Sequence, residues 1–325
     1  MIGIPRSLFY HHLYPFWSSF FAELGVAHQL SPPTNQAILT RGAALAVDEL
    51  CLPVKLHLGH LAYLQDKADY LFSPGFGRWG RRRHFCPKLM GLPDLARHIF
   101  PNAREFWHDL DADDKPRTAA WEEALAGIAP GITKKEIARA GRIAWRQQLR
   151  FTALCRQGFT PPEAIAHLTA GAPLVRPEGN PRLAIAVLGH PYLVYDEHAN
   201  QQLLRTLRAA GARIHTEEML PADEHYATWP HQSKEVYWPL GQQILAAGFH
   251  YARRRSVGGL IFLTACLCGP DALLGELLER YLAKTPGAPP LLRLTIDEHT
   301  GRAGLLTRIE AFIDLLAWRR KHAAL

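Results

Sequence analysis

The stretch GGLIFLTACLCGPDALLGELLERY, residues 258–281, has the pattern of a buried strand, a turn and a helix. Apolar residues run almost without interruption to Ala265, as in a strand that is buried within a sheet. Pro270 follows the turn, and proline is favoured in the first turn of a helix. Cys266 and Cys268 lie in the turn, too close in sequence to form an unstrained disulfide. The stretch therefore predicts a strand–turn–helix unit of an α/β protein with two thiols in its turn.

Strands and helices alternate in two parts of the chain, and a purely helical segment separates them. The expected strands lie at 2–4, 26–30, 68–74 and 183–189, and within 258–271 and 290–299. The helical segment spans about 121–173 and includes a long helix from Lys134 to Cys155. Because this alternation is typical of parallel sheets covered by helices, we predict two flavodoxin- or Rossmann-like α/β halves joined by a helical bridge. The predicted parts are an N-terminal α/β domain at 1–118, the bridge at 119–178 and a C-terminal α/β domain at 179–325.

Local signals add detail to this outline. We expect a turn from Pro5 to His12, an aromatic helix from about Pro15 to Leu24 that Gly25 ends, and a further helix capped by Thr34. In the last helix, four apolar residues at helical spacing should face the core: Leu305, Ile309, Phe312 and Leu316.

The chain of 325 residues is basic, with a formal net charge of +7 and a pI of about 9.2. The excess positive charge lies mainly in RWGRRRH (78–84), RRR (253–255) and WRRKH (318–322). Such patches can be solvated surface, or can dock nucleic acid, an anionic cofactor or an acidic partner. No zinc-finger spacing or RNA-binding signature accompanies them, so we do not expect a nucleic-acid partner.

Nothing in the sequence indicates a membrane-spanning helix, because no run of roughly 18 or more uncharged apolar residues occurs. The start, MIGIPRSLFYHHLYPFW, lacks the basic, apolar and small-residue regions of a secretion signal. We expect a cytoplasmic protein, in which five cysteines serve metal binding or catalysis rather than disulfides.

Three of the five cysteines have a proline one or two residues later: Cys51, Cys86 and Cys268. Each precedes a predicted helix, where the positive end of the helix dipole and free N–H groups favour the thiolate, the form that binds metals. Strand-to-helix turns also lie at the carboxyl end of a parallel sheet, where α/β proteins bind ligands. The fold could therefore bring three thiolates to one point between the halves.

Thiolates gathered at one point repel each other unless a cation is present. The long separations do not fit zinc fingers or ribbons but are compatible with an iron–sulfur cluster assembled by the fold. Buried structural cysteines are the alternative. Cys155, in the helical bridge without a following proline, is expected to pack in the core, and Cys266 could be a core residue or a fourth ligand.

Six blocks of sequence, spread from the first residues to the last helix, carry a resemblance to a known family. They are IPRSLFYHHLYPFW, LSPPTN, AVDELCLPVKLHLGH, CPKLMGLPD, CGPD and IDEHTGRAGLLTRIEAF. The chain resembles the family related to 2-hydroxyacyl-CoA dehydratase activases, which includes dehydratase D-component-like proteins. The wider superfamily includes subunits of 2-hydroxyacyl-CoA dehydratases and benzoyl-CoA reductases, and double-cubane cluster proteins.

The resemblance implies a low-potential iron–sulfur cluster between the halves, either [4Fe–4S] or a double-cubane [8Fe–7S]. Carried over residue by residue, its ligands fall on Cys51, Cys86 and Cys268. The resemblance also implies a role in anaerobic metabolism, a separate ATP-hydrolysing activase that supplies electrons, and a homodimer. The chain would then reduce a substrate such as an acyl-CoA, as a reductase or dehydratase component, or relay electrons to a partner enzyme.

The chain itself has no GxxxxGK[ST] loop and no GxGxxG after a predicted strand, so it shows no ATP or NAD site of these kinds. Any ATP would be hydrolysed by another protein. A reading of a different class also stays open: a non-redox zinc protein, or a structural or assembly module with a basic partner-docking surface.

Three residues are candidates for catalysis because they follow predicted strands: His11, His12 and Tyr192. The two histidines could donate protons to a substrate, or could belong to a partly buried aromatic cluster. Lys55 and Lys88 follow Cys51 and Cys86 closely, where a positive charge would stabilise a reduced cluster, or they could be surface lysines.

Two further loops could contribute to a site. In GHPYLVYDEHAN (189–200), Tyr195 and Asp196 could line the cleft or order the loop. In IDEHTG (296–301), the acidic residues and His299 could do acid–base work, or could form a solvated turn with Thr300 as a helix cap.

Overall fold

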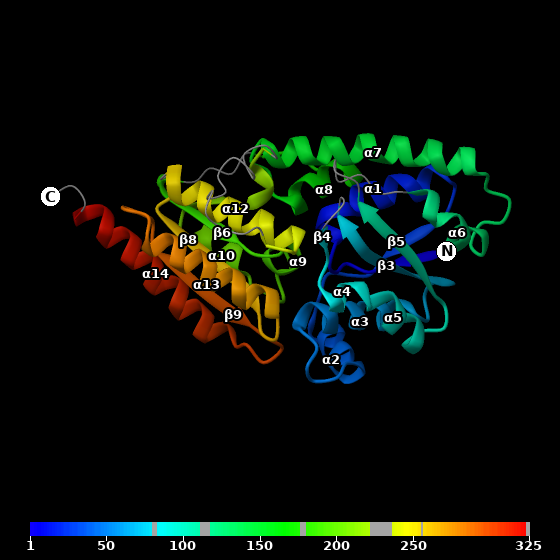
Figure 1. The fold of residues 1–325 in the computed structure, drawn as a ribbon, viewed down its shortest axis with the longest axis horizontal. Coiled ribbons are helices and arrows are strands. Elements are labelled where there is room, and N and C mark those ends of the chain that lie inside the picture. Colours follow the sequence, from blue (N-terminus) through cyan, green and yellow to red (C-terminus); the bar gives the residue numbers. More distant parts are fainter. Residues whose placement is uncertain (80–82, 111–117, 176–179, 222–235, 255, 323–325) are drawn as a thin grey trace.

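The computed structural model describes residues 1–79, 83–110, 118–175, 180–221, 236–254 and 256–322. Two α/β halves lie side by side, and a long helix runs across the top of the N-terminal half (Figure 1). One sheet is built from strands between Ile2 and Leu110, and the other from strands between Asn180 and Ile296. The prediction of two parallel-sheet α/β halves is confirmed, while the exact domain boundaries stay a prediction.

Five strands form the N-terminal sheet. They are β1 (Ile2–Ile4), β2 (His28–Leu30), β3 (Tyr70–Trp79), β4 (Arg83–His84) and β5 (Ala103–Leu110). Strands β2, β1, β3 and β5 are parallel and lie in that order, whereas the short β4 pairs antiparallel with the end of β3. Of the basic segment 78–84, residues 80–82 lie outside the described part of the chain, so its role as a docking loop stays a prediction.

Four parallel strands form the C-terminal sheet. They are β6 (Asn180–Leu188), β7 (Ala212–His215), β8 (Gly259–Ala265) and β9 (Leu291–Ile296), in the order β7-β6-β8-β9. Strand β8 is buried along its whole length, as its apolar sequence predicts. Its side chains alternate between two cores: Ile261 and Leu263 join the core shared by both halves, and Leu260 and Phe262 join a second core on the opposite face.

The helices cover both sheets. In the N-terminal half and the bridge they are α1 (Tyr10–Glu23), α2 (Gln36–Leu45), α3 (Leu52–Leu64), α4 (Pro87–Met90), α5 (Leu92–Ile99), the 3-10 turn η1 (Thr118–Trp121), α6 (Glu122–Ala126), α7 (Lys134–Arg156) and α8 (Pro161–Ala170). In the C-terminal half they are α9 (Pro191–Val194), α10 (Leu203–Ala209), η2 (Glu217–Met219), α12 (Pro239–Arg254), α13 (Gly269–Ala283) and α14 (Arg302–His322). In α14, the four apolar residues predicted to face the core are buried. None of the described helices is long and apolar enough to cross a lipid bilayer.

Two local predictions in the first half are wrong. Helix α1 begins at Tyr10, not near Pro15, because Pro15 lies within a helix whose aromatic face is deeply buried. The cap of α2 is Asn35, whose side chain accepts a hydrogen bond from the N–H of Ile38, and not Thr34. Thr34 instead uses its hydroxyl in a contact with the other half, described below. Strand β5 and helix α12 were not anticipated.

Helix α1 is fixed by aromatic packing on one side and by α7 on the other. Trp17 packs against Phe72 of β3, and Phe20 against Trp121, with ring centroids 4.8 Å and 4.9 Å apart. On its other side α1 runs against α7, where Gln148 donates a 2.7 Å hydrogen bond to a backbone carbonyl of α1. This packing holds the first turn of α1, with its tyrosines and histidines, at the junction between the halves.

Helices α2 and α3 touch backbone to backbone at two glycines. A Cβ atom on Gly42 would lie 1.9 Å from the carbonyl oxygen of Lys55, and one on Gly59 would lie 2.0 Å from that of Ile38. No larger residue fits at either position without moving a helix. The contact sets the position of α3, and with it that of Cys51 at the start of the helix.

Candidate functional site: two cavities between the halves

Open parallel sheets bind ligands beyond the carboxyl ends of their strands, at the point where the strand order reverses. In the C-terminal half this point lies between β6 and β8, because β7 and β9 lie on opposite sides of that pair. In the N-terminal half it lies between β1 and β3, with β2 and β5 on opposite sides. The segments that follow β1, β6 and β8 line two cavities, each with walls from both halves.

The first cavity, which we name the thiol cavity, has a volume of about 270 Å³ and is lined by Cys51, Cys86 and Cys268. Each cysteine is the N-cap residue of a helix that has proline in its first turn, namely α3, α4 and α13. The structure thus brings together the three cysteines that the sequence pattern selects. Cys155 is buried in the core, away from this cavity.

Burial dominates the electrostatics of the thiol cavity. It raises the pKa of Cys51, Cys86 and Cys268 above the usual value, and the carboxylate of Asp271 raises that of Cys268 further. The ammonium group of Lys88 acts in the opposite direction on the pKa of Cys51 and Cys86, but does not outweigh burial. The helix N-termini alone therefore do not produce the thiolates that the sequence suggested, and a bound cation is needed to favour them.

The turn between the two neighbouring cysteines separates their roles. Leu267 adopts a left-handed backbone conformation, with φ of 64°, so that Cys268 lines the cavity and Cys266 does not. The N–H of Cys266 instead donates to the carbonyl of Ile296 in β9, at 2.8 Å. Leu8, after β1, is also left-handed, with φ of 49°, and lines the same cavity. Strained conformations of bulky residues gather at functional sites, because the surrounding structure must hold them in place.

Two residues of this site were missed by the sequence analysis, His190 and Asp271. The Nε2 atom of His190 lies 2.9 Å from Oδ1 of Asp271, and together with Sγ of Cys268 their donor atoms lie within 4.8 Å of one another. Asp271 is only 1% exposed, so its carboxylate is shielded from water. A buried carboxylate beside a histidine and a thiol is a candidate site for a divalent metal.

Both residues lie in short sequence motifs whose role becomes clear only in the fold. Asp271 ends the CGPD block and lies in the first turn of α13. His190 follows Gly189, whose φ of 144° suits glycine, and a Cβ there would lie 2.4 Å from the carbonyl oxygen of Leu263. The tight approach of this glycine to β8 places His190 beside the turn that holds Cys268.

The two lysines differ. Lys88 lines the thiol cavity, and its ammonium group donates to the backbone carbonyls of Glu49 (2.7 Å) and Leu267 (3.2 Å), which lie in different halves. Lys55 is buried, does not line the cavity, and forms an ion pair with Glu298 after β9. The ion pair of Lys55 with Glu298, an acidic residue of the 296–301 loop, therefore links the two halves.

The three candidates for catalysis are dispersed. Tyr192 lines the thiol cavity, with its ring stacked on that of His190 at a centroid distance of 4.8 Å. His11 lines the second cavity. His12 lines neither, and burial lowers its pKa to about 4.

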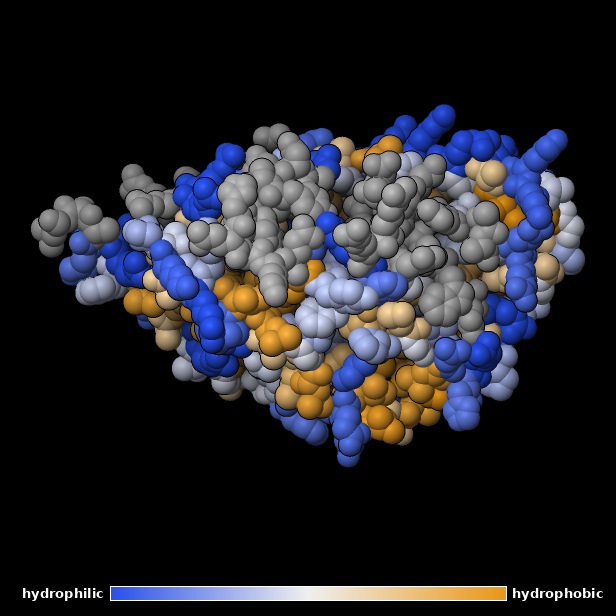
Figure 2. All heavy atoms as spheres, viewed as in Figure 1, coloured by the Kyte–Doolittle hydropathy of each residue, from blue (hydrophilic) through white to orange (hydrophobic). Residues whose placement is uncertain are grey.

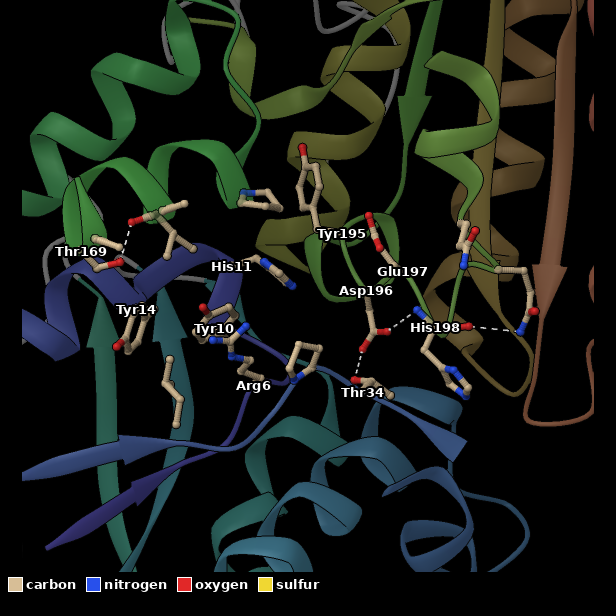
Figure 3. Close-up of a pocket in the computed structure, with 18 of the residues that line it drawn as sticks. Arg6, Tyr10, His11, Tyr14, Thr34, Thr169, Tyr195, Asp196, Glu197 and His198 are labelled. Carbon is tan, nitrogen blue, oxygen red and sulfur yellow. Dashed lines mark hydrogen bonds between the residues drawn. The ribbon is translucent and has the colours of Figure 1, made fainter. Parts of the chain in front are cut away.

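The second cavity, which we name the arginine cavity after Arg6, has a volume of about 620 Å³ and shares no lining residue with the thiol cavity. Figure 3 shows Arg6, Tyr10, His11 and Tyr14 on the wall from the N-terminal half, facing the 195–198 segment on the other side. Helix α8 closes a third side with Thr169. Tyr195 and Asp196, which the sequence suggested as cleft residues, thus line this cavity.

A chain of buried and half-buried hydrogen bonds crosses between the halves along the wall of the arginine cavity. The backbone N–H of Arg6 donates to Oγ of Ser31 (2.9 Å), and Ser31 contacts Nδ1 of His60 (2.8 Å). Nε2 of His60 contacts the hydroxyl of Thr34 (3.0 Å), which donates to Asp196 (Figure 3). Since Thr34 donates to the carboxylate, it accepts from His60, so the ring carries its proton on Nε2. Ser31, His60 and Thr34 each accept one hydrogen bond and donate the next, from the N–H of Arg6 at one end to the carboxylate of Asp196 at the other, which links the two walls.

The first two thirds of the chain match a known family. Residues 1–220 match the family described as CoA enzyme activase uncharacterised domain (DUF2229). The match covers about two thirds of the chain and includes Cys51, Cys86 and Arg6, whereas Cys268 lies beyond it. No curated protein matches the chain.

Proposed function

Because the chain belongs to the family of CoA enzyme activase uncharacterised domains, we propose that it holds an iron–sulfur cluster and passes single electrons to a CoA-dependent enzyme. The observation that carries the proposal is the convergence of Cys51, Cys86 and Cys268 on one cavity between the halves. The narrower grouping with dehydratase D-component-like proteins is part of the proposal.

The size of the thiol cavity supports a single cubane cluster. Its volume of about 270 Å³ equals that of roughly nine liquid-water molecules. A [4Fe–4S] core has eight atoms, so the cavity is large enough for it.

The chemistry of the lining also suits a cluster. Three thiols, each at a helix N-terminus, supply three of the four ligands of a [4Fe–4S] cluster and leave one iron open or held by another group. A bound cluster would supply one-electron transfer at low potential. The carboxylate of Asp271 adds negative charge beside Cys268, which disfavours the reduced form, while the ammonium group of Lys88 at the rim opposes it.

A partner surface lies next to the rim of the thiol cavity. The hydrogen bonds of Lys88 hold residue 49 close to Leu267, and the segments that carry this contact have exposed apolar side chains: Val47 (63% exposed), Leu267 (53%) and, in α13, Leu273 (56%). Figure 2 shows apolar patches on this face over α2 and over α13. An apolar patch beside a redox site is suited to docking a protein that exchanges electrons.

The family description exchanges the roles that the sequence analysis gave to this chain and to its partner. The sequence analysis expects a separate ATP-hydrolysing activase, whereas the family description places this chain itself among activase-type domains. We therefore propose the CoA-dependent enzyme as the partner that docks at the thiol cavity. An acyl-CoA substrate and a homodimer stay part of the proposal.

One observation favours a second candidate, a zinc site. Cys268, His190 and Asp271 offer sulfur, nitrogen and oxygen donors within 4.8 Å of one another, and such mixed sets bind Zn²⁺. Both candidate sites use Cys268, but only a cluster also requires Cys51 and Cys86. Substitution of these cysteines therefore distinguishes a cluster from a zinc site.

The experiment is to purify the full chain without oxygen and to measure iron, acid-labile sulfide and zinc per chain. For the cluster we expect about four irons and four sulfides, most of them lost in Cys51→Ser, Cys86→Ser and Cys268→Ser, and retained in the matched control Cys266→Ala. Zinc that is lost in His190→Gln but retained in Cys86→Ser would instead establish the zinc site. Protein that binds neither metal would refute both.

A further inference from the structure

We propose that the arginine cavity is a binding site for a small organic acid, with the ligand carboxylate held by Arg6. The cavity is separate from the thiol cavity and has no residue in common with it. Its volume of about 620 Å³ lies within the range of small-molecule sites. The inference does not rest on the proposed electron-transfer function.

Arg6 is the anchor because its charge has no partner in the described part of the chain. It directly follows Pro5 at the end of β1, at the point where the strand order reverses. Its guanidinium carbon lies 5.4 Å from the centre of the Tyr10 ring, no described carboxylate pairs with it, and its Nε is buried without a hydrogen bond. An arginine held in this way presents a planar set of donors that matches a carboxylate or a phosphate.

The groups beside Arg6 add donors and no negative charge. The hydroxyls of Tyr10 and Tyr14 make no hydrogen bond with the described residues, and burial raises the pKa of Tyr10 to about 12, so that its hydroxyl stays protonated. Burial and the charge of Arg6 lower the pKa of His11 to about 3, which keeps its ring neutral, and its Nδ1 is buried without a partner. Figure 3 shows these side chains on the same wall as Arg6.

The acids of the opposite wall are engaged elsewhere. Asp196 accepts from the hydroxyl of Thr34 with one oxygen, and from the N–H groups of His198 (3.1 Å) and Ala199 (2.9 Å) with the other. Glu197 is exposed. Neither carboxylate pairs with Arg6, so the guanidinium is left for a ligand.

The rest of the cavity is suited to an apolar ligand body. Leu30 and Pro33 come from the N-terminal half, and Ile165 and Ala166 from α8. A ligand with a carboxylate at Arg6 would place its hydrocarbon part against these side chains. This combination favours a carboxylate with a short aliphatic or aromatic body over a bare inorganic anion, which would leave the apolar wall uncovered.

The test is calorimetric titration of the full chain with benzoate and hexanoate, with phenyl phosphate and inorganic phosphate, and with benzamide, the uncharged match to benzoate. We expect saturable binding of the two carboxylates in the micromolar to millimolar range, and none of benzamide. In Arg6→Gln the carboxylate affinity should fall about ten- to a hundredfold, because hydrogen bonds to a charged group are lost. The control Arg97→Gln removes an arginine that pairs with Asp94 at the surface, and should bind as the wild type does.

A second variant guards against a folding defect in Arg6→Gln. Tyr14→Phe removes one hydroxyl from the cavity wall and leaves the ring in the core, so it should fold normally and weaken carboxylate binding severalfold. Equal affinity in Arg6→Gln and the wild type, equal binding of benzamide and benzoate, or no binding of any probe at millimolar concentration would overturn the proposal. Binding of the phosphates without the carboxylates would overturn the assigned ligand class.

Discussion

Buried neutral histidines should make this fold sensitive to mild acid. His57 is fully buried, with Nδ1 2.8 Å from the hydroxyl of Ser7, and burial lowers its pKa to about 3. The unfolded chain binds a proton at this residue below its ordinary pKa of about 6.5, whereas the folded chain stays neutral until the pH approaches 3. Stability is therefore fully present above pH 6.5 and falls as the pH is lowered below it.

The size of the effect follows from the two pKa values. Between pH 7.5 and pH 5.5, the unfolded state gains nearly one proton at His57 that the folded state does not, which costs about 1.4 kcal/mol of the free energy of unfolding. His11, His12 and His60 have pKa values lowered by burial to about 3, 4 and 3. Together the four residues lower stability by roughly 5 kcal/mol over this interval, a large part of the total for a typical domain.

The assay is urea unfolding of the wild type and of His57→Gln at both pH values. The quantity of interest is the difference in unfolding free energy between pH 7.5 and pH 5.5, which should be about 1.4 kcal/mol smaller in the variant. The matched control, His322→Gln, removes an exposed histidine at the end of α14 and should retain the wild-type difference. An unchanged difference in His57→Gln would show that His57 takes up its proton in the folded state, and would refute the reasoning.

Two further predictions concern packing and the contact between the halves. Gly59→Ala should lower the free energy of unfolding by at least about 2 kcal/mol, because the added Cβ would collide with a carbonyl of α2. The control Gly304→Ala lies in the exposed first turn of α14, where a Cβ would have nothing within 4 Å, and should raise the free energy of unfolding by about 0.5–1 kcal/mol. Equal effects of the two substitutions in a thermal melt would contradict the close contact. Thr34→Val should lower the free energy of unfolding by about 1–3 kcal/mol, because Asp196 and His60 each lose a hydrogen-bond partner. Thr34→Ser keeps the hydroxyl and should retain most of the wild-type stability. A valine variant as stable as the wild type in urea would show that the chain of hydrogen bonds contributes little.

The sequence predicted those parts of the fold whose signals are local. Strand β6 from Leu183 onward and nearly all of β8 are apolar runs, and helix α7 begins at a capping box formed by Thr133 and Glu136, so length and pattern sufficed. Helix α1 was placed too late because Pro15 was taken as its start. Proline in the first turns of a helix is a boundary signal, but the burial of the aromatic face extends α1 back to Tyr10.

Within the site, the sequence selected residues by the chemistry of single positions. A cysteine before a helix-starting proline is such a position, and the structure lines one cavity with all three of them. His190 and Asp271 have no such signature, because each gains its significance only from the other. Arg6 looked like one arginine among many in a basic chain, and only the fold shows that no carboxylate among the described residues pairs with it.

The contacts between the halves that lie near the two cavities join residues far apart in the sequence. Thr34 and Asp196 are separated by 162 residues, Lys88 and Leu267 by 179, and Lys55 and Glu298 by 243. Each pair joins one half to the other, and no periodicity in a short window reports such a pairing. The reversal of strand order at the centre of each sheet explains why these pairs meet where they do, because it directs the loops of both halves toward the same junction. The sequence could thus indicate that a site lies between the halves, whereas its division into a thiol cavity and an arginine cavity follows from the way the two halves face each other.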